Sequence, residues 1–242
     1  MITTTKAIVL RALKYGDSRL IVDLLTEQFG RLSFIQHIPK TGRARVKKQF
    51  FQPLTIMEAT FDFRPNAPLQ RLRDVALSAP FISIPFDPVK LSIALFIAEF
   101  IYYGTRDEQG NEPLFEYVTA SVRWLDGCCG AVANFHLTFM LHIARFIGFS
   151  PNTDCDSPDA CFDLRSGCFT DSVPLHADFL RPEDASRLRQ LLRMDFSNMH
   201  LFRMSREERN RCTEIMLNYY RLHVADFPEL RSFSVMKELF GS

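Results

Sequence analysis

The chain has 242 residues and a formal net charge of +1, with 47% hydrophobic and 24% charged residues. This composition is typical of a globular protein and excludes a disordered or low-complexity chain. The first 80 residues hold 13 Lys and Arg against 6 Asp and Glu, whereas the rest of the chain holds 16 against 22. Because a basic region attracts polyanions and an acidic region repels them, we expect any nucleic acid to bind the N-terminal part.

The first 80 residues have the pattern of a small β-barrel. Five segments rich in Ile, Val, Leu, Phe and Thr are separated by turn residues, at positions 5–13, 19–27, 30–38, 53–63 and 69–77. Apolar residues alternate with their neighbours at Leu20, Val22 and Leu24, as in half-buried strands. Short breaks at Gly16 and Gly30 indicate that the first three strands form a meander. The pattern predicts an OB-type barrel over residues 1–80, although an SH3-like barrel would produce almost the same pattern.

After residue 80 the hydrophobic period lengthens to about 3.6, which predicts an α-helical domain over residues 81–242. Helices are expected at 91–104, 113–125, 133–149, 182–192 and 205–224, followed by closing helices. Ser205 and Glu208 have the spacing of a capping box, which marks the start of one of these helices.

A polar, turn-rich segment at about residues 150–174 interrupts the helices. It contains FDLRSGCFT, which predicts a small hairpin turning at Ser166 and Gly167. The expected fold class is therefore α+β: an N-terminal OB-type five-stranded β-barrel followed by an α-helical domain with a small β-hairpin insertion.

The sequence predicts a cytoplasmic protein. Its longest apolar run, residues 91–104, is too short to span a bilayer and contains Glu99. The first residues do not have the pattern of a secretory signal peptide. Six cysteines without regular spacing are consistent with a reducing compartment.

The strongest local signal is a basic segment between the third and fourth predicted strands. Five cations and no acid fall within nine residues there: Lys40, Arg43, Arg45, Lys47 and Lys48. Such a loop can reach several phosphate oxygens at once, although a solvated turn is the alternative. Phe50 and Phe51 follow directly, and their rings could either stack on an unpaired base or belong to the core. The predicted nucleic-acid-binding set is these five cations together with Lys14, Arg19 and Phe51.

No catalytic or metal site is expected. The chain has no Walker-type loop, GxGxxG, GxSxG or HExxH motif, and its basic part has no carboxylate cluster suited to metal-assisted phosphodiester cleavage. Cys155, Cys161 and Cys168, with His176 beyond them, are weak zinc candidates, because their spacing is wider than the CxxC knuckles of structural zinc sites. We therefore expect a protein that is not an enzyme and has no cofactor.

Several segments resemble the RecO family of recombination mediators. The family's N-terminal barrel is similar to KAIVLRALKYGDSRLIVDLLTEQFGRLSFI, the basic loop and FFQPLTIMEA. Its central helix, the hairpin after it and its closing helices are similar to FHLTFMLHIARFIGFSP, FDLRSGCF and YYRLHVADFPELRSFSVMKELF. The resemblance covers essentially the whole chain and is most specific in the N-terminal third. It implies an OB-fold domain followed by an α-helical domain, in a bacterial, nucleoid-associated protein.

The resemblance also implies a function without catalysis. Such proteins bind single- and double-stranded DNA, anneal complementary strands, work with RecR, and load the RecA recombinase onto DNA coated with single-stranded DNA-binding protein (SSB). Their helical domain binds the acidic, Phe-ended tail of SSB, for which Arg123 and Arg145 are the candidates here. Many members carry a four-cysteine zinc module, whose paired knuckles this sequence lacks.

Two functions of other classes remain open. The helical part could be the working surface of a protein-interaction scaffold, with the barrel contacting only other proteins. Alternatively, the barrel could bind RNA, which fits the charge as well as DNA does.

Overall fold

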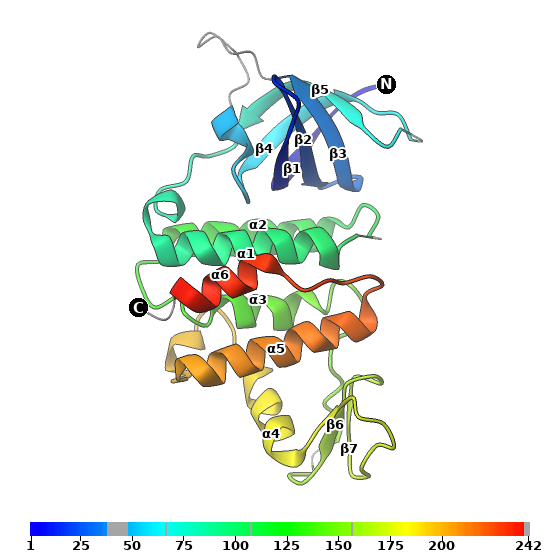
Figure 1. Ribbon diagram of the computed structural model, residues 1–242, viewed down its shortest axis with the longest axis vertical. Coiled ribbons are helices and arrows are strands. Elements are labelled where there is room, and N and C mark those ends of the chain that lie inside the picture. Colours follow the sequence, from blue (N-terminus) through cyan, green and yellow to red (C-terminus); the bar gives the residue numbers. More distant parts are fainter. Residues whose placement is uncertain (38–47, 66, 107, 156, 240–242) are drawn as a thin grey trace. The chain divides into compact units, whose positions relative to one another are not determined.

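The structure is a computed structural model that describes residues 1–37, 48–65, 67–106, 108–155 and 157–239 (Figure 1). The chain folds into two compact units. The first contains residues 1–128 and 230–239, and the second contains residues 129–229.

The first unit begins with a closed five-stranded barrel. Its strands are β1 (Ile2–Tyr15), β2 (Arg19–Thr26), β3 (Gly30–His37), β4 (Ile56–Asp62) and β5 (Gln70–Leu77). They follow the order β1-β2-β3-β5-β4, in which β3 and β5 pair in parallel and the other pairs are antiparallel. The predicted OB-type barrel and its five strands are confirmed.

Alternation of side chains builds the barrel core. The inward-facing Leu20, Val22 and Leu24 are at most 5% exposed and belong to one cluster with the buried rings of Phe34 and Phe61. Because successive side chains of a strand point to opposite faces, the intervening residues of β2 lie on the outer face.

Three helices complete the first unit: α1 (Pro88–Gly104), α2 (Glu112–Gly127) and α6 (Arg231–Leu239). The carboxylate of Asp87 caps α1 by accepting hydrogen bonds from the backbone N–H groups of Val89 and Lys90. α1 packs against both β1 and α6. The predicted boundary near residue 80 falls between β5 and α1, but the compact unit also contains α1 and α2, so the division into domains 1–80 and 81–242 stays a prediction.

The second unit contains α3 (Phe135–Ile143), α4 (Pro182–Leu191) and α5 (Arg206–His223). Both reciprocal hydrogen bonds of the predicted capping box, between Ser205 and Glu208, are present at the start of α5. α3 ends six residues earlier than the predicted end at 149, in a turn that contains Gly148 with a φ of +87°. A positive φ is outside the helical region, so the helix could not have continued through Gly148 to the predicted end.

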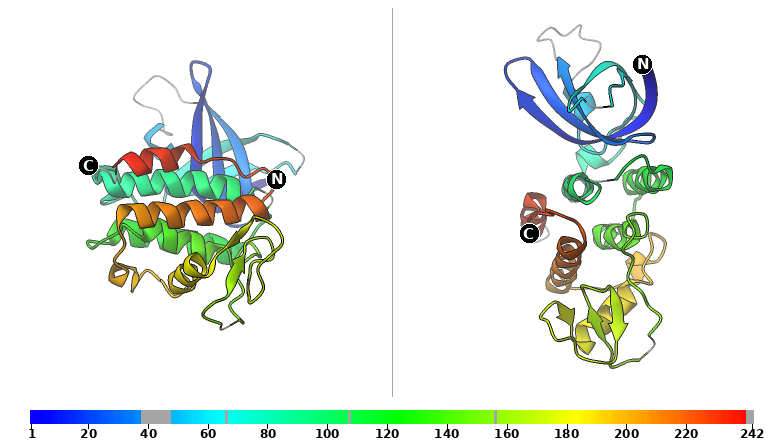
Figure 2. Two further views of the ribbon diagram at one scale, coloured as in Figure 1. Left: turned by 60° about the horizontal axis from the view of Figure 1, so that its bottom comes forward. Right: turned by 90° about the vertical axis from the view of Figure 1, so that its right-hand side faces the viewer.

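The predicted hairpin is confirmed, with one strand more than expected. β6 (Cys161–Asp163) and β7 (Cys168–Thr170) are antiparallel, and β8 (Phe179–Leu180) pairs with the other edge of β6. Figure 2 shows this small sheet beside α4, which it contacts. Within the described part of the chain, no helix combines the length and the hydropathy needed to cross a membrane.

Candidate nucleic-acid interface

The predicted nucleic-acid-binding residues differ in whether the structure describes them and in whether they are exposed. Lys40, Arg43, Arg45 and Lys47 lie outside the described residues, which resume at Lys48. Lys14, Arg19 and Lys48 are exposed. Phe51, at the end of the 3-10 helix η1 (Lys48–Phe51), is only 3% exposed and belongs to the barrel core cluster. Its ring is therefore not available for stacking in this structure, because its faces pack inside the barrel.

The outer face of β1, β2 and β3 carries an exposed group of side chains at one end. Strand pairing places Tyr15 opposite Arg19, and Arg19 opposite His37. The adjacent row runs through four strands and consists of Leu13, Ile21, Ile35 and Arg71. We call these seven residues the open face.

Exposure distinguishes the open face from the core beneath it. Tyr15 is 53% exposed and Leu13 is 45% exposed. Arg19, His37 and Arg71 are also exposed, while Ile21 and Ile35 are half-buried. The open face thus combines aromatic rings, apolar side chains and two guanidinium groups.

The continuation of this outer face is covered by α1. Arg11 on β1 donates to Asp23 at 2.9 Å and to the hydroxyl of Tyr102 on α1 at 2.7 Å, and Ser33 donates to the same Asp23. Arg31 donates to the backbone oxygen of Tyr102 at 2.6 Å. Both guanidinium groups lie over the Tyr102 ring, 4.0 and 4.5 Å from its centroid. Because of these contacts, α1 covers the outer face at Arg11, Asp23 and Arg31.

The β4–β5 loop is shaped by a buried side chain. Gln70 is 2% exposed, and its amide accepts from the backbone N–H of Arg64 and donates to the carbonyls of Arg64 and Ala67 at 2.8–3.1 Å. These bonds hold the backbone at Arg64 and Ala67. The exposed side chain of Arg64 therefore extends from a restrained position.

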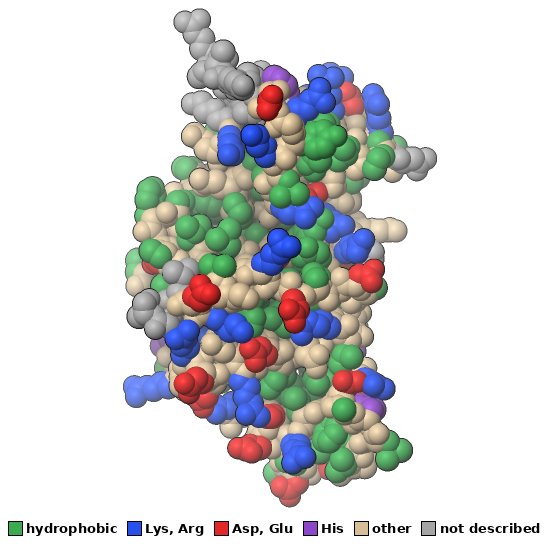
Figure 3. Space-filling model, in the orientation of Figure 1, with side chains coloured by type: hydrophobic (Ala, Val, Ile, Leu, Met, Phe, Trp, Pro, Cys, Tyr) green, Lys and Arg blue, Asp and Glu red, His purple; other side chains and the backbone are tan. Residues whose placement is uncertain are grey.

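The charges of the barrel fall into two groups. Lys6, Arg11 and Arg73 form salt bridges with Glu27, Asp23 and Asp62. Among the described residues, Lys14, Arg19, Lys48, Arg64 and Arg71 form none, and neither does Arg31, whose guanidinium is bonded to Tyr102 instead. Figure 3 shows Lys and Arg side chains gathered over the barrel at the top of the view. Exposed cations without acidic partners are suited to binding phosphates.

Sequence reasoning missed every residue of the open face except Arg19, and it also missed the exposed Arg64. The signal was partly present, because strand alternation already places Tyr15 on the same face as Leu13. The pairing of β3 with β5 could not be read from the sequence, and this pairing brings Arg71 beside Ile35.

A second candidate site is a pocket of about 380 Å³ in the second unit. It is lined by the segment before α3 and by the connection into α5, with Ala131, Ala133, Asn134, Met199, His200, Phe202, Arg203, Met204, Ser205 and Arg209.

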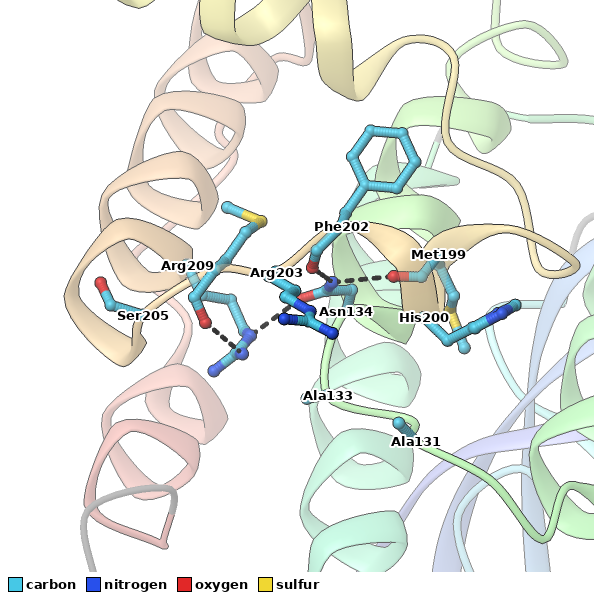
Figure 4. A pocket seen from close by; sticks show the side chains of 10 residues that line it. Ala131, Ala133, Asn134, Met199, His200, Phe202, Arg203, Ser205 and Arg209 are labelled. Atoms are coloured by element: carbon cyan, nitrogen blue, oxygen red, sulfur yellow. Dashed lines mark hydrogen bonds between the residues drawn. The ribbon is translucent and has the colours of Figure 1, made fainter.

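Asn134 organises this pocket (Figure 4). Its amide donates to the carbonyls of Met199 and Phe202, and its oxygen accepts from Arg209 Nε at 2.9 Å. Arg209 also donates to the carbonyl of Met204, and burial lowers the pKa of its guanidinium. With the exposed Arg203, the pocket offers cations beside apolar side chains.

The two predicted tail-binding residues belong to different units. Arg123 lies on α2 in the first unit and Arg145 follows α3 in the second unit, and both are exposed. Neither lines the pocket at Asn134.

The two cysteines of the small sheet, Cys161 and Cys168, are not paired with each other on neighbouring strands. Cys161 is buried and pairs with Thr170, while Cys168 pairs with Asp163. Cys155 Sγ lies 3.8 Å from an oxygen of Asp171. Across the described ranges, no three His, Cys, Asp or Glu side chains gather in a way that could hold a metal ion. The expectation of no zinc stays a prediction.

Comparison with known proteins identifies the family. The family model described as "Recombination protein O N terminal" matches residues 1–81, and the one described as "Recombination protein O C terminal" matches residues 85–232. A DNA repair protein RecO of Phocaeicola vulgatus is 48% identical over 242 residues, the whole of both chains. One of Bacteroides fragilis is 47% identical over 99% of this chain and all of its own, and one of Christiangramia forsetii is 32% identical over the full length of both. The chain therefore belongs to the RecO family of DNA repair proteins.

Proposed function

We propose that this protein is a DNA-binding recombination mediator, which anneals complementary strands and helps load the recombinase onto SSB-coated single-stranded DNA during recombinational repair. The observation that carries the proposal is the open face of the barrel, where Arg19 and Arg71 are exposed without acidic partners. The basic segment of residues 40–48 follows β3 in the sequence and adds five cations to the same part of the chain.

The proposed mechanism is electrostatic. Two strands repel each other through their phosphates, and cations that neutralise both sets of phosphates remove that repulsion and release condensed counterions. Pairing of the bases then supplies the driving force, so annealing requires no nucleotide hydrolysis and no catalytic group.

Partner binding belongs to the same proposal. The pocket at Asn134 combines Arg203 and Arg209 with the apolar Met199 and Phe202, which is the chemistry that an acidic, Phe-ended SSB tail requires. We place the tail there in preference to Arg123 or Arg145. RecR is the expected second partner, and the expected location is the bacterial cytoplasm in association with the nucleoid.

A strand-annealing assay tests the main proposal. The full-length protein should accelerate pairing of SSB-coated complementary oligonucleotides without ATP. Changing Arg43, Arg45, Lys47 and Lys48 together to Ala should weaken single-strand binding and lower the slope of log K against log salt by up to about 3. Replacing Lys237 on α6 by Ala serves as a control outside the barrel.

The alternatives predict other results. Unchanged affinity in the four-fold variant at low salt would mean that residues 40–48 are a solvated turn. Binding to partner proteins with no salt-dependent DNA binding would indicate a scaffold, and a strong preference for RNA over DNA of the same sequence would indicate an RNA-binding barrel.

Calorimetry with a synthetic SSB tail peptide tests the pocket. Arg203→Glu should weaken peptide binding by about tenfold or more, because it reverses an exposed charge beside the pocket. Arg123→Ala and Arg145→Ala should bind the peptide as the parent does. Loss of binding in either of these variants, with normal binding by Arg203→Glu, would place the tail elsewhere.

A further inference from the structure

We infer that the open face is a platform for unpaired bases, on which Tyr15 and His37 stack bases while Arg19 and Arg71 hold the flanking phosphates. The inference rests on the proposed DNA binding and goes beyond it, because it assigns the bases to particular side chains and favours single strands over duplex.

The first argument is register. Arg19 pairs with Tyr15 on one side and with His37 on the other, so the three side chains stand in one row across β1, β2 and β3. Neighbouring strands are about 4.8 Å apart, so one row brings rings and guanidinium within reach of adjacent nucleotides. Arg71 lies at the end of the next row, opposite Ile35.

The second argument is the chemistry of that next row. Leu13, Ile21 and Ile35 present apolar side chains on the outside of the barrel, and Leu13 is 45% exposed. Phosphates gain nothing from such a surface, whereas the faces of unpaired bases are apolar enough to cover it. A duplex keeps its bases stacked inside and offers mainly phosphates to this face, so the apolar row favours single strands.

The third argument is the limit that α1 sets. Tyr102 and the guanidinium groups of Arg11 and Arg31 close the row that follows, and Asp23 beneath them is only 2% exposed. On the described part of this outer face, α1 therefore leaves the rows of the open face accessible to bases. Phe51, the stacking residue expected from the sequence, is inside the barrel, so Tyr15 and His37 take that role.

Equilibrium binding by the full-length protein tests the platform, with a labelled oligothymidine as single strand and a duplex of equal length. Tyr15→Leu combined with His37→Leu removes both rings and keeps apolar side chains. This variant should bind the single strand about tenfold more weakly with an unchanged salt slope, because no phosphate contact is lost. Its duplex affinity should change less than twofold. Tyr15→Phe, which keeps the ring, should bind as the parent does.

Arg19→Ala combined with Arg71→Ala provides the contrasting measurement. It should weaken the binding of both the single strand and the duplex. The slope of log K against log salt for the single strand should become less negative by about 1.4, because two phosphate contacts are lost. Melting curves that match the parent establish that the variants are folded.

Two results would overturn the platform. One is unchanged single-strand affinity in the double Leu variant, and the other is an equal loss for single strand and duplex. If the arginine variant is weakened in either case, DNA binding by the barrel still holds. If the parent protein binds neither ligand at low salt, the proposed function fails together with the platform.

Discussion

At the scale of single residues, the clearest dependence on one side chain is that of the β4–β5 loop on Gln70. Its amide is buried and makes three hydrogen bonds with the backbone of Arg64 and Ala67. Burying such polar groups is tolerated only while each keeps its hydrogen-bond partner, because a buried donor or acceptor without a partner carries the full free-energy cost of desolvation.

Replacing Gln70 by Met should therefore lower the free energy of unfolding by about 2–3 kcal/mol, as measured by urea denaturation. Gln36→Met is the matched control: the half-buried Gln36 side chain donates, among the described residues, to the backbone oxygen of its neighbour His37 alone, so its loss should cost less than about 0.5 kcal/mol. Equal costs for the two variants would contradict the proposed role of Gln70.

A second single-residue effect concerns acid stability. Burial, and then the positive charge of Arg209, lower the pKa of His136 to about 3 from the ordinary 6.5. Between these values the unfolded chain binds a proton that the folded chain does not. The contribution of His136 to stability is therefore complete above pH 6.5 and is lost as the pH falls, by up to about 1.4 kcal/mol per pH unit.

His136→Gln should flatten the dependence of urea stability on pH between about pH 6 and 4. Met216→Ala weakens the packing of the buried face of α5 without removing an imidazole, so it should lower stability at every pH and keep the parent's slope. If the His136→Gln variant keeps the parent's dependence of stability on pH, His136 does not cause the loss of stability at acid pH.

At the scale of elements, two glycines allow the β2–β3 turn to fit against the loop between α1 and α2. A Cβ at Gly30 would lie 2.4 Å from the carbonyl oxygen of Glu108, and one at Gly110 would lie 2.1 Å from that of Gln28. No side chain larger than hydrogen fits at either position, so the two connections are in direct backbone contact.

Gly16 supplies a control for this contact. Gly16 and Gly30 have nearly the same backbone angle, with φ of +68° and +66°, but a Cβ at Gly16 would meet nothing within 4 Å. Gly16→Ala should cost only the backbone strain, about 1 kcal/mol, and Gly30→Ala should cost about 2 kcal/mol more, because the loops must separate. Urea unfolding of both variants measures the difference; equal losses would show that the close approach contributes nothing.

The small sheet of the second unit leads to a prediction about metal. Cys155, Cys161 and Cys168 lack the spacing of zinc knuckles, so the purified protein should contain well under one equivalent of zinc. A chelator should leave its melting temperature unchanged. Stoichiometric zinc in a metal analysis would instead restore these cysteines, with His176, as ligands.

At the scale of the whole molecule, the chain returns to its first unit at the end. α6 packs on α1, where the rings of Phe96 and Phe233 lie 6.1 Å apart. The carboxylate of Glu99 accepts hydrogen bonds from the backbone N–H groups of Arg231 and Ser232 and from the Ser232 hydroxyl. A residue of α1 thus serves as the N-terminal cap of a helix more than 130 positions later in the sequence.

Glu99→Ala should destabilise the first unit by about 1–2 kcal/mol through loss of this cap. Hydrogen exchange should become faster in α6, while exchange in α5 of the second unit stays as in the parent. Glu238→Ala, which removes an exposed carboxylate of α6, is the control and should leave both helices unchanged. Faster exchange in α5 as well would mean that the two units unfold together.

The sequence by itself determined most of the elements and the family; β8 and the end of α3 are the exceptions. The five strands, the hairpin at Ser166 and Gly167, and the capping box of α5 depend on side-chain alternation, turn residues and hydrogen bonds between neighbours in the chain. These are short-range effects, so a pattern of a few residues is enough to predict them. The concentration of positive charge in the first 80 residues is likewise a property of composition.

Only the tertiary structure decided which side chains face outward together. Phe51 follows the basic segment in the sequence but packs inside the barrel, and Arg71 joins Ile35 through the parallel pairing of β3 with β5. The pocket at Asn134 forms from segments about 65 residues apart. Such groupings depend on barrel closure and helix packing, in which each contact joins parts of the chain that are distant in sequence, so a pattern of a few neighbouring residues does not reveal them.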